Sequence, residues 1–269
     1  MRVSVVGLGL IGGSFAKAAM AAGHEVEGWD LDPSVRDSAG AAGISITETP
    51  GAPLVIAALP PKAVVPWVES HAGGFAPKTV VVDVCGVKGA VCGALRKYAF
   101  ADWCFIGGHP MAGKELGGWE RSDAGLFSGA SMILTPYPSC GRVPLDMLEG
   151  FFSGLGFART VITTPERHDE MIAFTSQLAH VVSSAYVRDP LAKEHRGFSA
   201  GSFQDMTRVS TVDPDAWTSL FLSNAEPLSR VLGRLIGRLA EYKDAIDARD
   251  ADALRAMLAE GRAAKLACG

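Results

Sequence analysis

The stretch FIGGHPMAG, from Phe105 to Gly113, holds a single histidine between glycines and a proline, directly after an apolar run that predicts a strand. Gly107, Gly108 and Pro110 disfavour regular structure, so we place His109 on a loop. An imidazole is the side chain that most readily exchanges a proton near neutral pH. We therefore interpret His109 as a candidate catalytic group, and the alternative is a loop histidine with a satisfied hydrogen bond.

A second motif with chemical meaning is the glycine pattern GxGxxG formed by Gly7, Gly9 and Gly12. The pattern alone is weak in a chain with 31 glycines, but here it follows an apolar run and opens an Ala-rich helix pattern. In a first βα turn such glycines allow a tight turn and let a pyrophosphate approach the backbone at the helix N-terminus. With Leu10 and Ile11 between them, they predict a dinucleotide site. The alternative is a glycine-rich turn without a nucleotide.

An acidic residue ends the second predicted strand at the spacing that this site needs. Asp30 lies 21 residues after Gly9, placed to accept hydrogen bonds from both ribose hydroxyls. A carboxylate repels the 2′-phosphate of NADP, and no arginine follows it immediately. The sequence therefore predicts NAD as the cofactor. FAD shares the fingerprint, but nothing else in the chain indicates a flavin.

The elements that must position these residues are short strands that alternate with helices, an order typical of βα units around a parallel sheet. Ligands of such a sheet collect at the carboxyl ends of its strands, which is where His109 would then lie. A seventh run, Ala158 to Thr163, can close the sheet. The other predicted strands are Arg2 to Gly7, Glu25 to Asp30, Pro53 to Pro60, Thr79 to Val84, Trp103 to Gly108 and Ala130 to Pro136.

The rest of the chain reads as helical. The sequence from Thr164 to Glu166 predicts a helix start, with Thr as the N-cap, Pro at the first position and an acid in the first turn. Three long segments follow with apolar residues at helical spacing, the second interrupted by Pro227. We predict a Rossmann-type nucleotide-binding domain over residues 1–163 and an all-α domain over residues 164–269.

The first long helix carries a polar stripe. Small or polar residues recur on it at steps of three and four, on an otherwise apolar helix that we expect to be buried. Such a stripe faces either solvent or a hydrated site. Its members are Asp169, Ala173, Ser176, Gln177, His180 and Ser184.

Composition argues against several classes of protein. A net charge of -4 and a pI near 5.9 give no broad basic surface for nucleic acid. The five cysteines are odd in number and lack CxxC spacing, so we expect reduced packing thiols, with no disulfide framework and no metal site. The chain start offers no signal peptide, and the apolar stretches are broken by Gly, Lys or Pro. We predict a cytoplasmic protein that does not insert in a membrane.

Three motifs carry a resemblance to a known family: GGHPMAGKE from Gly107, HDEMIAFTSQLAH from His168 and AGSFQDMTRVSTVDPDAW from Ala200. In this order they resemble prephenate dehydrogenase, a tyrosine-pathway family that includes arogenate dehydrogenases, and the similarity runs from Arg2 to about Arg238. The resemblance implies NAD(P)-dependent oxidative decarboxylation of prephenate to 4-hydroxyphenylpyruvate and CO2, or of arogenate to tyrosine. It also implies a homodimer through the helical domain. Because the sequence ends shortly after its last predicted helix, we expect neither a regulatory ACT domain nor a fused chorismate mutase.

The resemblance assigns roles to individual residues. His109 matches the catalytic histidine, which accepts a hydrogen bond from the ring hydroxyl as C4 gives up a hydride. His180 matches a second histidine on the substrate side. Arg208 matches the arginine that binds a carboxylate, and the alternative is a surface or helix-capping arginine. The remaining matches are Glu115, near the substrate entrance, and Gly201 and Trp217, which keep their spacing to Arg208.

Three positions depart from the family pattern. Gln177 stands where the family often has a histidine, and Gly86 stands where many members have a serine near the nicotinamide. Gln204 replaces a frequent lysine. The loss of a cation at position 204 would suit arogenate, whose ammonium group a lysine would repel.

Two other functions compete with this interpretation. A β-hydroxyacid dehydrogenase also has a helical second half, but it depends on a lysine in the long interdomain helix, and this chain has none between Lys114 and Lys193. A non-catalytic NAD-binding sensor on the same scaffold would be expected to have lost its catalytic positions. His109, His180 and Arg208 are all present, which favours an enzyme.

Overall fold

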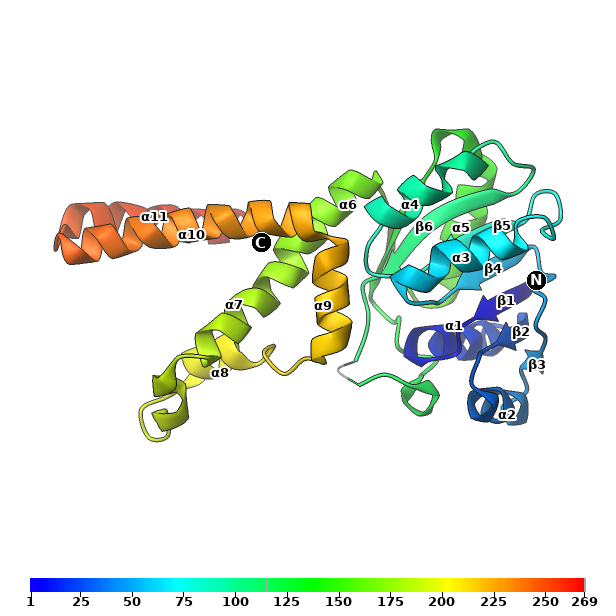
Figure 1. Cartoon of the computed structure of the whole chain (residues 1–269), viewed down its shortest axis with the longest axis horizontal. Coiled ribbons are helices and arrows are strands. Elements are labelled where there is room, and N and C mark those ends of the chain that lie inside the picture. The colour runs from blue at the N-terminus through cyan, green and yellow to red at the C-terminus, as the bar shows by residue number, and fades with distance from the viewer. Residues whose placement is uncertain (115, 269) are drawn as a thin grey trace. The chain divides into compact units, whose positions relative to one another are not determined.

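The computed structural model describes residues 1–114 and 116–268, which form two compact units (Figure 1). Unit 1 contains Met1–Ile172 together with Thr211–Asn224, and unit 2 contains Ala173–Ser210 and the chain from Ala225 onward. Each compact unit is therefore built from two separate segments of the chain. The predicted domain limits of 1–163 and 164–269 stay a prediction.

Unit 1 is built on one eight-stranded sheet in the order β3-β2-β1-β4-β5-β6-β7-β8. The first six strands are parallel in the doubly wound order, whereas β7 runs antiparallel to β6 and parallel to β8,. The predicted strands are all present, and only the two-residue β3 was not foreseen. The strands are β1 (Arg2–Val6), β2 (Glu25–Trp29), β3 (Ser45–Ile46), β4 (Leu54–Ala57), β5 (Val80–Asp83), β6 (Cys104–Pro110), β7 (Ser131–Pro136) and β8 (Arg159–Ile162).

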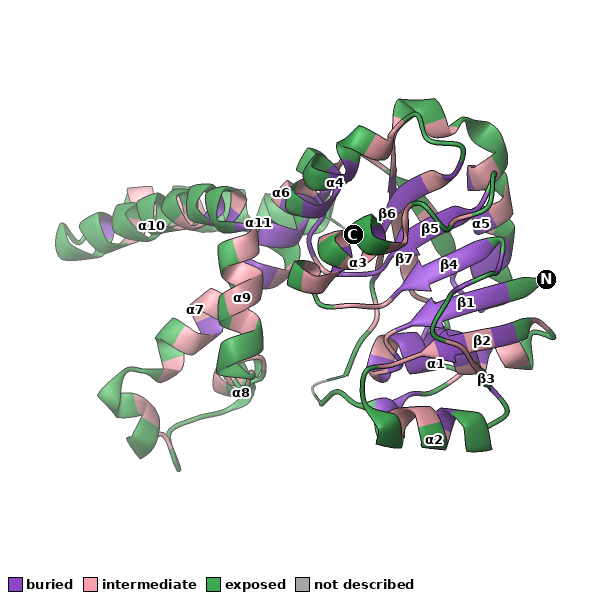
Figure 2. Ribbon diagram, turned by 45° about the vertical axis from the view of Figure 1, so that its right-hand side comes forward, coloured by how far each residue is buried: buried purple, intermediate pink, exposed green. Residues whose placement is uncertain are grey.

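Helices cover both faces of this sheet, and so its central strands are buried on both sides (Figure 2),. Val55 and Val81 pack with α3 and α4 in one apolar cluster. Leu54, Ile56 and Val82 pack with α1 and α5 in the other. The helices of unit 1 are α1 (Leu10–Ala21), α2 (Pro33–Ala41), α3 (Pro61–His71), α4 (Gly89–Leu95), α5 (Arg142–Gly154), α6 (Pro165–Ile172) and α9 (Pro214–Ser223).

All regular elements among the described residues of unit 2 are helices, as predicted. A π-helical stretch, Ala173–Gln177, leads into α7 (Leu178–Val187), and α8 (Gly201–Thr207) packs against α7. The long α10 (Ala225–Asp247) and α11 (Ala251–Ala267) pack against each other. Pro227 lies in the first turn of α10, where a proline costs no intrahelical hydrogen bond,. Within the described chain, none of the helices has the length and apolar character needed to cross a lipid bilayer.

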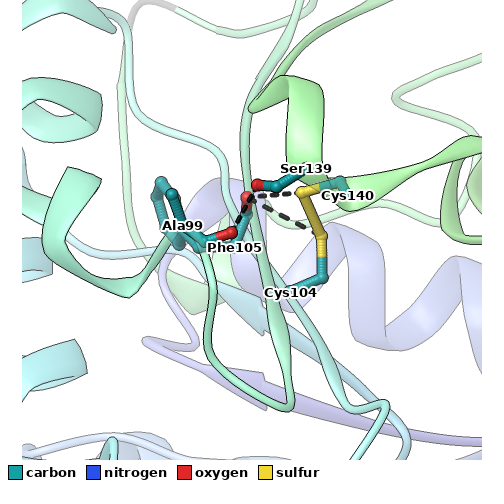
Figure 3. The surroundings of a disulfide bond; sticks show 5 residues. All are labelled: Ala99, Cys104, Phe105, Ser139 and Cys140. Atoms are coloured by element: carbon teal, nitrogen blue, oxygen red, sulfur yellow. Dashed lines mark hydrogen bonds between the residues drawn. A yellow bond between two sulfur atoms is a disulfide. The ribbon is translucent and has the colours of Figure 1, made fainter.

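The expectation of five reduced thiols is wrong for two of them. Cys104, at the start of β6, forms a disulfide with Cys140, just before α5 (Figure 3). Their Cα atoms lie 5.9 Å apart although 36 residues separate them in sequence. The antiparallel pairing of β6 with β7, which places Ile106 opposite Pro136, brings the two cysteines together. A spacing rule for short motifs cannot detect a pair created by strand pairing.

The first long helix is only partly buried. Asp169 and Gln177 of the polar stripe are buried, as a hydrated or packed site requires. However, Met171 and Phe174, which we expected to be buried, are 38% and 55% exposed in the single chain. Their exposure is a correction to the prediction.

Candidate functional site

The glycine turn between β1 and α1 has the geometry of a dinucleotide site, and its glycines serve different purposes. Gly7 has φ +84°, and a Cβ there would lie 2.4 Å from the carbonyl oxygen of Ala58. A Cβ on Gly12 would lie 1.7 Å from the carbonyl oxygen of Gly7. The fold itself therefore requires these two glycines. Beside Gly9, by contrast, no described heavy atom lies within 4 Å of an added Cβ.

The first turn of α1 directly follows Gly9, and its leading amides have no partner within the helix,. Leu10 is buried and Ile11 packs against the core. Both side chains thus anchor the helix, and it is their backbone amides that lie at its positive end. Open space beside Gly9 and unpaired amides at a helix N-terminus fit a pyrophosphate.

Asp30, at the end of β2, is held by the same turn. Its Oδ2 accepts from the amide of Leu8 at 2.7 Å and its Oδ1 from the amide of Asp32 at 2.9 Å. Arg36 was not foreseen near this carboxylate. Its guanidinium lies 4.5 Å from the centre of the Trp29 ring and donates to the carbonyl oxygen of Asp30 at 2.7 Å. A fixed cation therefore stands beside the predicted ribose-binding acid.

His109 lies in a strand, and its placement on a loop was wrong. β6 extends to Pro110 because it pairs with β7, and His109 lies opposite Ile133. The preceding glycines serve close packing: a Cβ on Gly107 would be 2.3 Å from Oγ1 of Thr135, and one on Gly108 would be 2.5 Å from the carbonyl oxygen of Asp83. Since β6 is parallel to β5, β4 and β1, His109 lies at the edge of the sheet where the glycine turn also lies.

A buried ion pair lies directly beneath His109. The ammonium group of Lys88 contacts the carboxylate of Asp83, and both side chains are fully buried. Lys88 also donates to the carbonyl oxygen of Gly108 at 2.7 Å, while Oδ1 of Asp83 accepts from the amide of Gly108 at 3.3 Å. The pair thereby fixes both the amide and the carbonyl group of Gly108, the residue that precedes His109.

The charge state of this ion pair follows from its surroundings. Burial by itself lowers the pKa of Lys88, but the negative charge of Asp83, the largest of the opposing effects, holds the pKa above its usual value. Burial is also the main reason why the pKa of Cys85 is raised beyond its usual range. We conclude that Lys88 is a permanent cation and that Cys85 is a neutral thiol.

His109 contacts a second histidine. Its Nδ1 lies 2.9 Å from Nε2 of His168, and Nδ1 of His168 lies 2.7 Å from Oδ1 of Asp169. Asp169 accepts from the amides of Lys88 at 2.8 Å and Gly89 at 2.7 Å, at the start of α4. The first turns of α6 are thus connected to the end of β6.

The other nitrogen of His109 faces Gly86. A Cβ on Gly86 would lie 3.8 Å from Nε2 of His109 and 3.3 Å from Cδ1 of Leu220 in α9. Burial first, then the nearby His168 and Lys88, lower the pKa of His109 to about 3. His109 is therefore a neutral imidazole at physiological pH.

The residues predicted on the substrate side fall into different units. Trp217, in α9, belongs to unit 1, where its ring packs edge-on against Phe221 at 5.4 Å. The predicted residues of unit 2 are Gln177 at the end of the π-helical stretch, His180 in α7, Gly201 and Gln204 in α8, and Arg208 directly after α8. That all of them contact one substrate stays a prediction. Glu115 lies outside the described residues.

Within unit 2, the environment of three of these side chains is defined. Nδ1 of His180 donates to the carbonyl oxygen of Val209 at 2.8 Å, so the lone pair of the neutral ring lies on Nε2,. Arg208 directly follows α8 and is exposed. Among the described residues, no carboxylate pairs with it. Gln177 is completely buried.

Three residues next to His109 were not foreseen from the sequence. His168 opens one of the three family motifs but has no predicted role, and Lys88 and Asp83 have none either. The only signal was local: His168 and Asp169 open a predicted helix, and Lys88 follows a predicted strand. His168 contacts His109, and Lys88 and Asp83 contact the preceding Gly108. These contacts join residues 20 to 59 positions apart, which no local pattern shows.

Comparisons with known proteins show the family to which the chain is similar. Residues 15–162 match the family described as "Prephenate dehydrogenase, nucleotide-binding domain", and residues 164–260 match "Prephenate dehydrogenase, dimerization domain". The chain is 29% identical over 285 residues to cyclohexadienyl dehydrogenase of Zymomonas mobilis, covering 99% of this chain and 95% of that protein.

Two solved structures have the same fold over the full chain. One is the arogenate dehydrogenase of Synechocystis, with a TM-score of 0.88, 25% identity and complete coverage of both chains. The other is the prephenate dehydrogenase of A. aeolicus in complex with hydroxyphenyl propionate and NAD+, with a TM-score of 0.86 and 26% identity. It is matched over 100% of this chain and 98% of that one.

Proposed function

The chain belongs to the prephenate dehydrogenase family, and from this premise we propose that it catalyses the NAD-dependent oxidative decarboxylation of prephenate to 4-hydroxyphenylpyruvate and CO2. In this reaction C4 of the ring loses a hydride while its hydroxyl becomes a carbonyl, and the ring carboxylate leaves as CO2. The electron pair of the broken bond to CO2 enters the ring, and the resulting aromatisation to a phenol drives the reaction. The protein must therefore supply alignment, a hydrogen-bond acceptor and anchors for the carboxylates.

One observation carries the proposal: a neutral, partly buried imidazole at the carboxyl edge of a dinucleotide-binding sheet. Only an uncharged imidazole can accept the hydrogen bond of the C4 hydroxyl. The low pKa of His109, about 3, keeps it uncharged. Nε2 of His109 faces the space next to Gly86, and we propose that the ring hydroxyl lies there.

The proposed cofactor fits the residues of the glycine turn. When bound, its nicotinamide supplies the hydride acceptor. The open side of Gly9 and the first amides of α1 would hold the pyrophosphate, and the carboxylate of Asp30 would accept from the ribose hydroxyls,. Asp30 favours NAD over NADP because its charge repels a 2′-phosphate.

Anchoring of the substrate is assigned to unit 2. We propose that Arg208 binds a substrate carboxylate, because its planar guanidinium matches both oxygens and because it is exposed. We propose that His180 also contacts the substrate. Glu115, Gln177, Gln204, Gly201 and Trp217 complete the proposed substrate side.

Arogenate is the second candidate substrate. It differs from prephenate in carrying an ammonium group on its side chain, and Gln204 puts a neutral amide where a cation would repel that group. One structural relative is an arogenate dehydrogenase, and the A. aeolicus relative is a prephenate dehydrogenase. Gln204→Lys should therefore lower the activity with arogenate more than that with prephenate.

Formation of NADH in the presence of each substrate tests the proposal. Turnover with prephenate supports it, and turnover with arogenate alone transfers the function to the second candidate. A protein that binds NAD but reduces it with neither substrate would instead be a sensor. The same assay with NADP measures the cofactor preference.

We further propose that the chain forms a homodimer through its helical unit. Apolar side chains more than half exposed in the single chain gather on α10 and α11, and clusters of this kind usually mark a contact surface. Light scattering coupled to gel filtration would measure the mass, and a monomer at micromolar concentration would contradict the proposal. These side chains are Ile236, Leu239, Ile246, Leu258 and Leu266.

A further inference from the structure

The side chain of His168 stands between the candidate catalytic imidazole and a carboxylate. It is 1% exposed and forms hydrogen bonds through both ring nitrogens, to His109 on one side and to Asp169 on the other. A buried histidine with two such partners has its proton placed by them.

The donor and the acceptor of each hydrogen bond in this series, which we call the proton order, follow from Asp169. Its Oδ1 accepts from the amide of Lys88, and its Oδ2 accepts from the amide of Gly89. A backbone amide can only donate, and so the carboxylate acts as an acceptor at both oxygens. The remaining bond to Oδ1, from Nδ1 of His168, is then also a donated one. In its neutral form, His168 then carries its proton on Nδ1.

The proton order extends from His168 to His109. With its proton on Nδ1, His168 has its lone pair on Nε2, which lies 2.9 Å from Nδ1 of His109. Nδ1 of His109 must donate to it. The lone pair of His109 is therefore on Nε2, the nitrogen that faces the space beside Gly86. In the opposite tautomer, Nε2 of His109 would carry a proton and could not accept.

We propose that His168 is a positioning residue that, supported by Asp169, holds His109 in the tautomer with an accepting Nε2. The inference rests on the proposed function in one respect only: it explains why that nitrogen is available to the substrate hydroxyl. The proton order itself is a property of the free protein.

Two amide variants test the role of the acceptor. In His168→Gln the new side chain places its terminal amide near the position of the imidazole Nε2, so its carbonyl oxygen can accept from Nδ1 of His109. In His168→Asn the same group is one methylene shorter, next to Asp169 and out of reach of His109. We expect His168→Asn to lower kcat by about 10²-fold or more with little change in KM, and His168→Gln to retain kcat within about 10-fold of the wild type.

The difference in kcat between the two variants reports whether Nδ1 of His109 has an acceptor for its proton. A loss of folding alone would not produce that difference. A merely structural role would affect both variants alike, or would change KM and NAD affinity together with kcat. Equal kcat values for the two variants, high or low, would overturn the proposal. NAD affinity, measured by fluorescence titration, serves as the control for an intact fold.

A measurement on the wild-type chain remains decisive if the variants do not fold. The ¹⁵N chemical shifts of a histidine ring distinguish the protonated nitrogen from the one with the lone pair, and His109→Asn assigns the signals of His109. We expect a protonated Nδ1 and a bare Nε2 at neutral pH. A protonated Nε2 refutes the proton order even if the enzyme turns over prephenate, whereas an inactive protein with a bare Nε2 refutes only the proposed function.

Discussion

Removal of the buried cation of Lys88 should destabilise unit 1 strongly. In Lys88→Met a flexible apolar chain of similar length replaces the lysine, and the carboxylate of Asp83 stays behind without its counter-ion. Breaking a buried pair in this way costs about 3–5 kcal/mol of the free energy of unfolding. The bond from Lys88 to the carbonyl oxygen of Gly108 is also lost.

This cost converts to a measurable change in melting temperature. For a chain of this size, 1 kcal/mol corresponds to about 2–4 °C, so we expect a decrease of about 6–20 °C for the transition of unit 1 by calorimetry. Lys97→Met is the matched control. Lys97 pairs with Glu69 at 2.6 Å, but with side chains that are 56% and 39% exposed, and such a pair contributes at most about 1 kcal/mol.

A double variant separates the uncompensated charge from the lost packing. Asp83→Asn combined with Lys88→Met leaves no charge in place of the buried pair, and we expect it to be more stable than Lys88→Met alone. If Lys88→Met and Lys97→Met lower the melting temperature equally, the buried pair contributes no more to the free energy of unfolding than the exposed pair. If the double variant is no more stable than the single one, the uncompensated carboxylate is not the cause.

The remaining predictions concern the proposed reaction and its pH dependence. His109→Asn should lower kcat by about 10²-fold or more and leave NAD affinity nearly unchanged; unchanged turnover would refute the assignment. Arg208→Ala should raise KM for the substrate, and an effect on NAD affinity alone would show that the arginine is misplaced. Asp30→Ala should increase the use of NADP, because Arg36 beside it can then pair with the 2′-phosphate; kcat/KM with both cofactors measures the change. The pKa of His109 is about 3 in the folded chain, against 6.5 for an ordinary histidine. Between pH 3 and pH 6.5 the unfolded chain therefore binds a proton at this residue that the folded chain does not. The free energy of unfolding should therefore fall as the pH decreases from about 6.5 towards 3, and this part of the dependence should be absent from His109→Asn.

The sheet could be predicted closely because its strands are short apolar runs buried on both faces. β4 (Leu54–Ala57) and β5 (Val80–Asp83) lie inside the predicted ranges. β3 was missed because two residues carry no periodicity. The extension of β6 to Pro110 was missed because it depends on an antiparallel neighbour, β7, and an intrinsic preference against strand at Gly107 and Gly108 was outweighed by that pairing,.

The candidate site shows a sharper division between what the sequence does and does not reveal. His109 could be found because a histidine between glycines and a proline, directly after an apolar run, is seldom placed there for packing alone. His168 could not be connected to it, because the contact spans 59 residues and depends on where α6 starts. The disulfide between Cys104 and Cys140 was missed because it depends on the pairing of β6 with β7. In each case the residue types were visible, and the distance between them was a property of the folded sheet.

The glycine turn shows why a motif can be correct for mixed reasons. Gly7 and Gly12 are required by contacts within the protein, with Ala58 and with each other, so any chain with this tight βα turn would need them whether or not it binds a nucleotide. Gly9 has no such contact, and a larger residue there would cost the fold little. The evidence for a cofactor in this motif therefore resides in Gly9 and in the position of Asp30, which is held by the amide of Leu8 from the same turn. The GxGxxG pattern counts the three glycines equally. It is therefore stronger evidence for the tight turn than for a bound nucleotide.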